Sequence, residues 1–306
     1  MRIILKTQAL GLALGLTAAV ALGACSVSSP GTAAGGRIRV VVAENFWGSI
    51  ARQLAGPDAD VSSIITNPDA DPHDYEPTAD DARTVASAQY VIMNGIGYDA
   101  WVQKLLDANP NGGRQVLNVG DLLGLKAGAN PHQWYSPTSV RRFITRVSAD
   151  LAKLDPSHRA AYEQRRAAYE STGLRDYNRL LAEIKRRFGG TAIGATESIV
   201  APWADGLGLR LITPKKFLDA VAEGNDPTRA DKATVDAQIA DRKIKVLVYN
   251  SQNATPDVKR LVDAARREHI PVTTVTETLV PEGATFQAWQ VRELQSLLGA
   301  LEGSNS

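Results

Sequence analysis

Short apolar runs alternate with amphipathic stretches through the first half of the chain. The runs are rich in Val, Ile and Leu and are bounded by polar residues, which predicts buried β-strands. These predicted strands cover residues 38–44, 61–66, 90–95 and 115–120. Helices are predicted over residues 47–54, 79–88 and 99–108. Alternating strands and helices are typical of a parallel sheet, so residues 37–137 are expected to form an α/β lobe.

The same alternation returns in the second half. The runs "TAIGATES", "RLITP", "IKVLVYN" and "PVTTVTE" predict strands. Helices are predicted for "TPDVKRLVDAARREHI" and for "TFQAWQVRELQSLLGAL" near the end of the chain. Residues 190–306 are therefore expected to form a second α/β lobe.

A segment without strand candidates lies between the two lobes. Residues 138–189 are rich in Arg, Ala, Leu and Glu, with a break at "LDPSH" where Pro156 suits the first turn of a new helix. We expect a long helix from residue 157 to about residue 188. The predicted fold class is thus α/β, with two lobes that each hold a parallel sheet flanked by helices. A long rigid linker helix joins the lobes, so they should close on a ligand by small rocking movements.

The beginning of the chain has the pattern of an export signal. Arg2 and Lys6 precede a stretch without charges over residues 9–24, which predicts a signal peptide over residues 1–24 and is short for a membrane span. Leu22, Gly23 and Ala24 before Cys25 resemble the bacterial lipobox, which implies cleavage and lipid attachment at this cysteine. The alternative is an ordinary free thiol near a cleavage site.

Residues 25–36 are rich in Ser, Gly, Ala and Pro and predict a flexible tether. The remaining chain of about 270 residues is long enough for one large domain or two medium ones. Over the full sequence, 34 basic residues balance 33 acidic ones, which gives no support for a nucleic-acid surface. We expect the lipid to be the membrane attachment, because no second long apolar segment follows.

Four candidate ligands for a divalent cation follow predicted strands. His73 lies in "DADPHDYEP", where the prolines indicate a loop, and His132 lies in "NPHQWYSP" beyond the fourth strand. Glu197 and Glu277 end the first and last strands of the second lobe. Ligands of parallel sheets bind at the carboxyl ends of the strands, so two candidates come from each lobe.

Each candidate also has a simpler interpretation. His73 can be a solvated loop residue, Glu197 a helix cap and Glu277 a solvated strand end. The acidic residues around His73, including Asp74, form either a solvated rim or groups that orient His73. Asn250 and Gln252, in "YNSQ", suit hydrogen bonds to the ligands. His158 and His269 belong to no motif and are expected at the surface.

These motifs make the chain similar to a known family, the metal-binding lipoproteins of bacterial zinc and manganese ABC importers. "DPHDYEPTADD" and "NPHQWYSP" resemble the two histidine motifs of that family, and the resemblance covers nearly the whole mature chain. "TESIVAPWADGLGL" resembles the third motif, in which the ligand stands eleven residues before Gly208, at Glu197. "VTETLVP" departs from the usual fourth motif, since Glu277, Thr278 and Leu279 stand where the family has Asp-Pro-Leu.

The resemblance implies a receptor of the bacterial cell envelope, anchored outside the cytoplasm by a lipid on Cys25. Its cargo would be Mn²⁺ or Zn²⁺, with Fe²⁺ as a third candidate, held by His73, His132, Glu197 and Glu277. Its partners would be an ABC permease and the cytoplasmic ATPase of that permease, and we expect a monomer. Glu197 stands where zinc-selective relatives usually place a third histidine, and the His-rich loop of many zinc receptors is absent. Oxygen ligands favour manganese, although zinc should also bind.

Two other functions remain open on the sequence. A metal held by two histidines and carboxylates could activate water in a secreted hydrolase. The chain has no His-Glu-x-x-His, Gly-x-Ser-x-Gly or Gly-x-Gly-x-x-Gly motif, and we expect no catalytic residues. A surface adhesin of the same fold is the second alternative.

Overall fold

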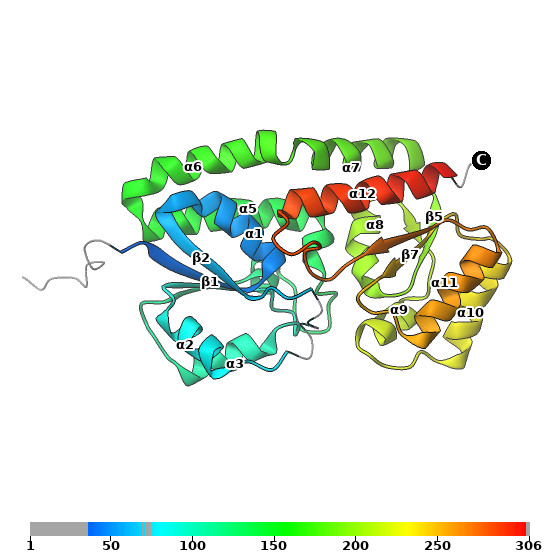
Figure 1. Ribbon diagram of the computed structural model, residues 1–306, viewed down its shortest axis with the longest axis horizontal. Coiled ribbons are helices and arrows are strands. Elements are labelled where there is room, and N and C mark those ends of the chain that lie inside the picture. Colours follow the sequence, from blue (N-terminus) through cyan, green and yellow to red (C-terminus); the bar gives the residue numbers. More distant parts are fainter. Residues whose placement is uncertain (1–35, 69, 71, 73–74, 304–306) are drawn as a thin grey trace, which may run out of the picture. The chain divides into compact units, whose positions relative to one another are not determined.

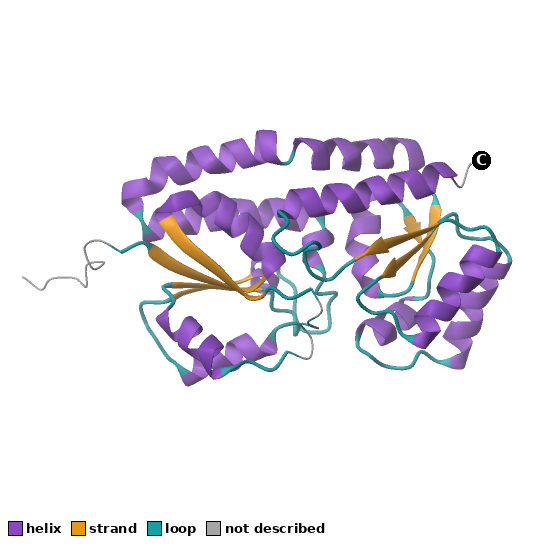
Figure 2. Cartoon of the chain, viewed as in Figure 1, coloured by secondary structure: helices purple, strands orange, loops and turns teal. Residues whose placement is uncertain are grey.

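Two parallel sheets of four strands each organise the computed structural model, which describes residues 36–68, 70, 72 and 75–303. The predicted signal peptide, Cys25, His73 and Asp74 lie outside the described residues. Helices flank both sheets, as Figure 2 shows. The predicted fold class, α/β with two lobes, is confirmed.

The sheet of the first lobe has the strand order β2-β1-β3-β4. Its strands are β1 (Ile38–Glu44), β2 (Ala59–Ile65), β3 (Tyr90–Met93) and β4 (Gln115–Asn118). In the register of this sheet, Val40 pairs with both Val61 and Tyr90. The third and fourth strands are shorter than predicted, because Asn94 and Gly95 turn toward Asp99 and residues 119–120 begin a helix.

The sheet of the second lobe repeats this arrangement, with the strand order β6-β5-β7-β8. Its strands are β5 (Ala192–Ala195), β6 (Arg210–Leu211), β7 (Leu247–Asn250) and β8 (Val272–Val275). All pairings in both sheets are parallel. The carboxyl ends of the strands in each sheet therefore share one edge, where parallel sheets usually bind ligands.

Twelve α-helices connect and cover these strands in the described part of the chain. They are α1 (Asn45–Ala55), α2 (Ala79–Ser87), α3 (Ala100–Ala108), α4 (Val119–Leu123), α5 (Pro137–Leu154), α6 (Arg159–Ala168), α7 (Arg175–Phe188), α8 (Ala201–Leu207), α9 (Lys215–Ala222), α10 (Arg229–Ala240), α11 (Pro256–Arg267) and α12 (Phe286–Gly303). None of these helices is both long enough and apolar enough to cross a membrane.

The linker between the lobes differs in one respect from the predicted single long helix. A π-helical turn over Tyr169–Gly173 separates α6 from α7, and α5 precedes them. The ring of Tyr169 is buried, and a Cβ atom at Gly173 would lie 3.1 Å from it, so glycine at this position leaves room for the ring. Figure 1 shows α12 running alongside α7, and the two helices are in contact.

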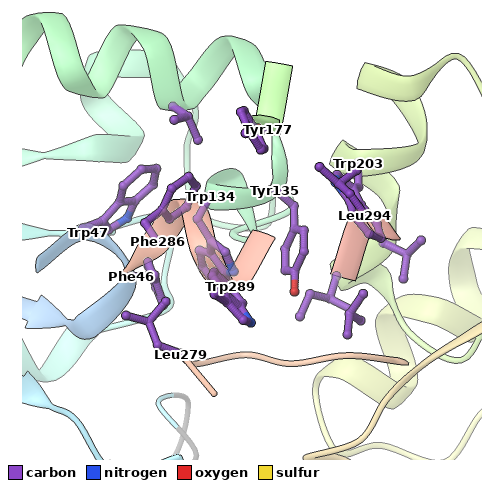
Figure 3. Packing of buried hydrophobic residues seen from close by; sticks show 14 of the residues in the cluster. Phe46, Trp47, Trp134, Tyr135, Tyr177, Trp203, Leu279, Phe286, Trp289 and Leu294 are labelled. Atoms are coloured by element: carbon purple, nitrogen blue, oxygen red, sulfur yellow. The ribbon is translucent and has the colours of Figure 1, made fainter. Parts of the chain in front are cut away.

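One hydrophobic core contains residues from both sheets and from the linker helices. Phe46 stacks on Trp134 with ring centroids 3.9 Å apart. Tyr135 lies between Trp203 and Trp289 (Figure 3). It makes edge contacts with both rings, each with centroids 5.5 Å apart. Aromatic side chains thus connect α1 of the first lobe with α8 of the second lobe and with α12.

Candidate metal centre

The segment that carries His132 joins β4 and α4 to the linker. Ser136 caps α5 by accepting a hydrogen bond from the backbone N–H of Ser139, and Pro137 occupies the first turn of that helix. The "SP" at the end of "NPHQWYSP" therefore begins a helix and fixes where the preceding loop ends. The side chain of His132 is fully buried at this position.

Asn130 determines which ring nitrogen of His132 carries the proton. Nδ2 of Asn130 donates to the carbonyl oxygen of Ser198 at 2.6 Å, and its Oδ1 accepts from the backbone N–H of His132 at 2.9 Å. These two backbone partners fix the orientation of the amide. The same Oδ1 lies 2.9 Å from Nδ1 of His132, so Nδ1 is the donor. In the neutral ring the lone pair is then on Nε2, which is the usual state of a metal-binding imidazole.

Glu277 approaches this imidazole from the other lobe. Its Oε1 lies 3.3 Å from Nε2 of His132, and its Oε2 accepts a hydrogen bond of 2.9 Å from the hydroxyl of Tyr98. His132 and Tyr98 belong to the first lobe, whereas Glu277 follows β8 of the second lobe. The carboxylate is therefore a point at which the two lobes meet.

Gln252 holds the backbone around Glu277. Its Oε1 accepts hydrogen bonds from the backbone N–H groups of Glu277 at 2.6 Å and of Thr278 at 3.1 Å. Its Nε2 donates to the hydroxyl of Thr278 at 2.9 Å and to the carbonyl oxygen of Pro68 in the first lobe. The side chain thus links the segment after β8 with the loop after β2.

Glu197 lies at the carboxyl end of β5 and is 1% exposed. It occupies the position before the short 3₁₀ helix Ser198–Val200, but its side chain does not cap that helix. Its oxygens instead accept hydrogen bonds from Nδ2 of Asn250 at 2.6 Å and from Nδ2 of Asn253 at 2.8 Å. Burial raises the pKa of Glu197 to about 7, and the charge of Glu277 contributes to the rise.

Asn250 connects the two glutamates. Its Nδ2 also lies 3.3 Å from Oε1 of Glu277, so one amide donates toward both carboxylates. The structure thus brings together His132, Glu277 and Glu197, the last through Asn250. Within the described ranges, no group of three or more His, Cys, Asp or Glu side chains is arranged to hold a metal ion.

A cavity of about 260 Å³ lies beside His132. Its lining comes from both lobes and includes Tyr98, Asn130 and Ser198, with Asp219 and Glu223 at α9. Space for a small ligand is therefore available next to the imidazole.

The other two histidines lie apart from these groups. His158 is half exposed, and its Nδ1 contacts Asp155 at 2.5 Å while its Nε2 lies 3.7 Å from Asp58. His269 is exposed after α11, with a positive φ of 57°. Both are surface residues, as the sequence predicts.

Three residues at the site were not predicted from the sequence: Tyr98, Asn130 and Asn253. Tyr98 and Asn253 follow β3 and β7, so the rule of the carboxyl strand ends could have indicated both. Asn130 stands in the histidine motif itself, two residues before His132.

Comparisons with known proteins agree with this architecture. Residues 40–300 match the family described as "Zinc-uptake complex component A periplasmic". The "Iron-binding protein YfeA" of Yersinia pestis is 32% identical over 139 residues, which cover 44% of each chain. The "Manganese ABC transporter substrate-binding lipoprotein PsaA" of Streptococcus pneumoniae is 27% identical over 164 residues, 49% of this chain and 53% of the relative. The chain thus spans about half the length of the curated relatives it matches.

Solved structures share the fold over a larger part of the chain. A manganese-bound periplasmic metal binding protein from Candidatus Liberibacter asiaticus has a TM-score of 0.72 at 20% identity, covering 87% of this chain and 100% of the other. The protein FpvC of Pseudomonas aeruginosa, in complex with Mn²⁺, has a TM-score of 0.71 at 20% identity, covering 88% of this chain and 100% of the other. With the match over residues 40–300, the chain belongs to the family of periplasmic zinc-uptake components.

Proposed function

We propose that the protein is the extracytoplasmic solute-binding component of an ABC importer. It captures a divalent transition metal between its two lobes and delivers the metal to a membrane permease, which a cytoplasmic ATPase drives. The proposed ligands are His73, His132, Glu197 and Glu277.

The observation that carries this proposal is the pairing of His132 with Glu277 across the two lobes, at 3.3 Å. Asn130 keeps the proton of the ring on Nδ1, so the lone pair of the neutral imidazole is directed toward the carboxylate. A cation between these groups would be attracted by both, and it would also join the lobes. The buried Glu197 next to Glu277 adds a second carboxylate, whose charge a dication would offset.

The surrounding amides suit a binding site for a metal cargo. Asn250 and Asn253 orient Glu197, and Gln252 holds the backbone of Glu277. Asp74, beside His73 in the sequence, is proposed to orient that histidine. We further propose that the protein has no catalytic activity. The hydroxyl of Ser198 lies 3.5 Å from Nδ1 of His132, but that nitrogen donates its proton to Asn130 and cannot act as a base toward the serine. A panel of hydrolase substrates tests this point.

The proposed cargo is manganese or zinc, with manganese favoured. Two carboxylates and two imidazoles can provide more than four ligand atoms, which suits Mn²⁺ or Fe²⁺ better than tetrahedral Zn²⁺. The names of relatives support a cargo of this class, since they include an iron-binding and a manganese-binding protein. Zinc should still bind, because it forms stronger complexes than manganese at most sites of nitrogen and oxygen.

The proposal includes a monomer held at the membrane by a lipid on Cys25. The sequence around Cys25 and the names of lipoprotein relatives support this anchoring. Residues 25–36 would form the tether between the lipid and the folded lobes.

Calorimetric titration of the metal-free mature protein with Zn²⁺ and Mn²⁺ tests the proposed function. We expect one bound ion per chain, and we expect His132→Ala to lose most of the affinity because it removes a ligand. His158→Ala is the matched control, since His158 is half exposed and contacts Asp155 and Asp58 instead. The proposal fails if the wild type binds neither metal, or if both variants lose the same affinity.

A further inference from the structure

Glu293 is a buried carboxyl group that contacts both of the segments on which His132 and Glu277 stand. It projects from α12 and lies 2.8 Å from the hydroxyl oxygen of Tyr135, three residues after His132. Its Oε1 accepts from the backbone N–H of Thr276, directly before Glu277, at 3.0 Å. One side chain thus bridges the two segments from beneath the site.

If Glu293 were ionised, the hydrogen bonds around Tyr135 would lack one proton. The single hydroxyl proton of Tyr135 faces two oxygens, Oε2 of Glu293 at 2.8 Å and the carbonyl oxygen of Thr276 at 2.9 Å. Both would be acceptors if Glu293 were a carboxylate, and the hydroxyl can donate to one of them. A proton on Oε2 resolves this, because Glu293 then donates to Tyr135 and Tyr135 donates to Thr276.

The remaining contacts of the carboxyl group agree with this arrangement. Oε1 accepts from the backbone N–H of Thr276 at 3.0 Å, and the hydroxyl oxygen of Thr276 lies 3.2 Å from it. That hydroxyl accepts from the indole N–H of Trp289 at 2.8 Å and donates its single proton to the nearer carbonyl oxygen of Thr278 at 2.9 Å. Oε1 therefore serves as the acceptor of the carboxyl group and Oε2 as its donor.

The electrostatic surroundings also favour the neutral acid. In the described part of the chain, no lysine or arginine forms an ion pair with Glu293. The titratable group that faces it is Tyr135, whose phenol is affected in turn by the charge of Glu277. Burial raises the pKa of Glu293 to about 8. A buried carboxylate without a cation is costly, so these surroundings favour the protonated form of Glu293.

We propose that Glu293 is an uncharged positioning residue, which joins the segments carrying His132 and Glu277 and so sets the spacing of these two groups. The effect of Glu293 on metal affinity rests on the proposed function, whereas its protonation does not. In this proposal α12, which packs in the hydrophobic core, also supports the segments that carry His132 and Glu277.

Glu293→Gln and Glu293→Leu distinguish this role from that of a buried charge. A glutamine amide can donate to Tyr135 and accept from Thr276, so it reproduces the neutral acid. We expect Glu293→Gln to keep the Zn²⁺ affinity of the wild type within about twofold at pH 7, and Glu293→Leu to lose about tenfold, because Leu leaves Tyr135 and Thr276 without their partner. Equal losses in both variants would overturn the proposal.

Gln290→Leu provides a matched control on the same helix. Gln290 is also buried, and its amide atoms have no hydrogen-bond partner among the described residues. We expect its removal to leave the Zn²⁺ affinity unchanged. If Gln290→Leu weakens binding as much as Glu293→Leu, the effect belongs to general packing of α12 and the positioning role is wrong.

Infrared spectroscopy of the metal-free protein measures the protonation directly. The difference spectrum between wild type and Glu293→Gln at pH 7 should contain the C=O stretch of a protonated carboxylic acid. A carboxylate band in its place would overturn the proposal, even if the protein binds metal. If the wild type binds neither Zn²⁺ nor Mn²⁺, the proposed function and the effect of Glu293 on affinity both fail, and the infrared band still decides its protonation.

Discussion

The hydroxyl of Tyr98 donates a hydrogen bond of 2.9 Å to Oε2 of Glu277 in the opposite lobe. Tyr98 lies in the turn after β3, where Asn94 and Gly95 donate their backbone N–H groups to Asp99 at 2.7 and 2.8 Å. This turn is therefore well ordered by its own hydrogen bonds, and it presents the phenol to the carboxylate. The contact orients one proposed ligand without occupying the side of the carboxylate that faces His132.

Tyr98→Phe should weaken metal binding by roughly tenfold, because a hydrogen bond to a charged group contributes about 1.5 kcal/mol. The midpoint of unfolding without metal should change little, since the ring stays in place. Titration with Mn²⁺ and urea unfolding measure the two quantities. A variant that loses stability but keeps its affinity would show that Tyr98 serves the fold and not the site.

Glu197→His should shift metal preference toward zinc. The substitution replaces a proposed oxygen ligand with an imidazole, so the proposed ligand set becomes three histidines and one carboxylate, which suits tetrahedral Zn²⁺. Competition between Zn²⁺ and Mn²⁺, measured for wild type and variant, gives the ratio of the two affinities. If this ratio stays the same, Glu197 does not select the metal and the argument for manganese loses its basis.

The stability of the metal-free protein should fall as pH rises from about 4 to about 8. Burial raises the pKa of Asp99 to about 6, and burial with the charge of Asp99 raises the pKa of Glu44 well above its ordinary value. At pH values between the pKa of an acid in the unfolded chain and its raised pKa in the folded protein, the folded state binds more protons than the unfolded state. The stabilisation from this acid is therefore fully present at low pH and is lost as the pH rises through the folded pKa. A shift of about two units corresponds to a loss on the order of 2–3 kcal/mol.

Glu44→Gln isolates the contribution of this carboxyl pair. Its curve of stability against pH should be flatter than that of the wild type, because one of the two buried acids no longer titrates. Urea unfolding of the metal-free proteins at a series of pH values provides the comparison. Parallel curves for the two proteins would mean that Glu44 does not titrate in this range.

Cys25→Ser should release the protein from membranes or leave its signal peptide uncleaved. The proposed attachment depends on a lipid, and no described helix is suited to span a bilayer. Fractionation of cells that express the wild type and the variant measures the membrane-bound share. Equal retention of both would contradict the lipid anchor.

The fold was predictable where local pattern and burial agree. The strands β1 and β7 are mostly apolar and mostly buried, and this pattern alone indicated where they lie, although β7 begins three residues later than the predicted run. The π-helical turn before α7, in which the ring of Tyr169 is buried, was not predictable because the sequence pattern there is that of a continuous helix. The contact of α12 with α7 also depends on the assembled core and has no signal in the sequence of either helix.

The site was partly predictable for the same reason. His132, Glu197 and Glu277 each follow a predicted strand, so the rule of the carboxyl strand ends identified them, and the structure brings them together through Asn250. Their function as ligands, like that of His73, remains a prediction. Glu293 lay beyond this rule, because it stands within a helix and reaches the site through the hydroxyl of Tyr135.

The continuous aromatic core beneath the site has a consequence for the time that an ion stays bound. Swinging the lobes apart would expose rings such as Trp134, Trp203 and Trp289, at roughly 25 cal/mol for each Å² of apolar surface. Exposure of about 200 Å² would cost on the order of 5 kcal/mol, so rearrangement of the ligand-bearing loops is the less costly way to free the ion. Under the proposed function, substitutions in those loops should act chiefly on the dissociation rate of the ion. A tightly held ion would then leave slowly until the proposed permease displaces the loops.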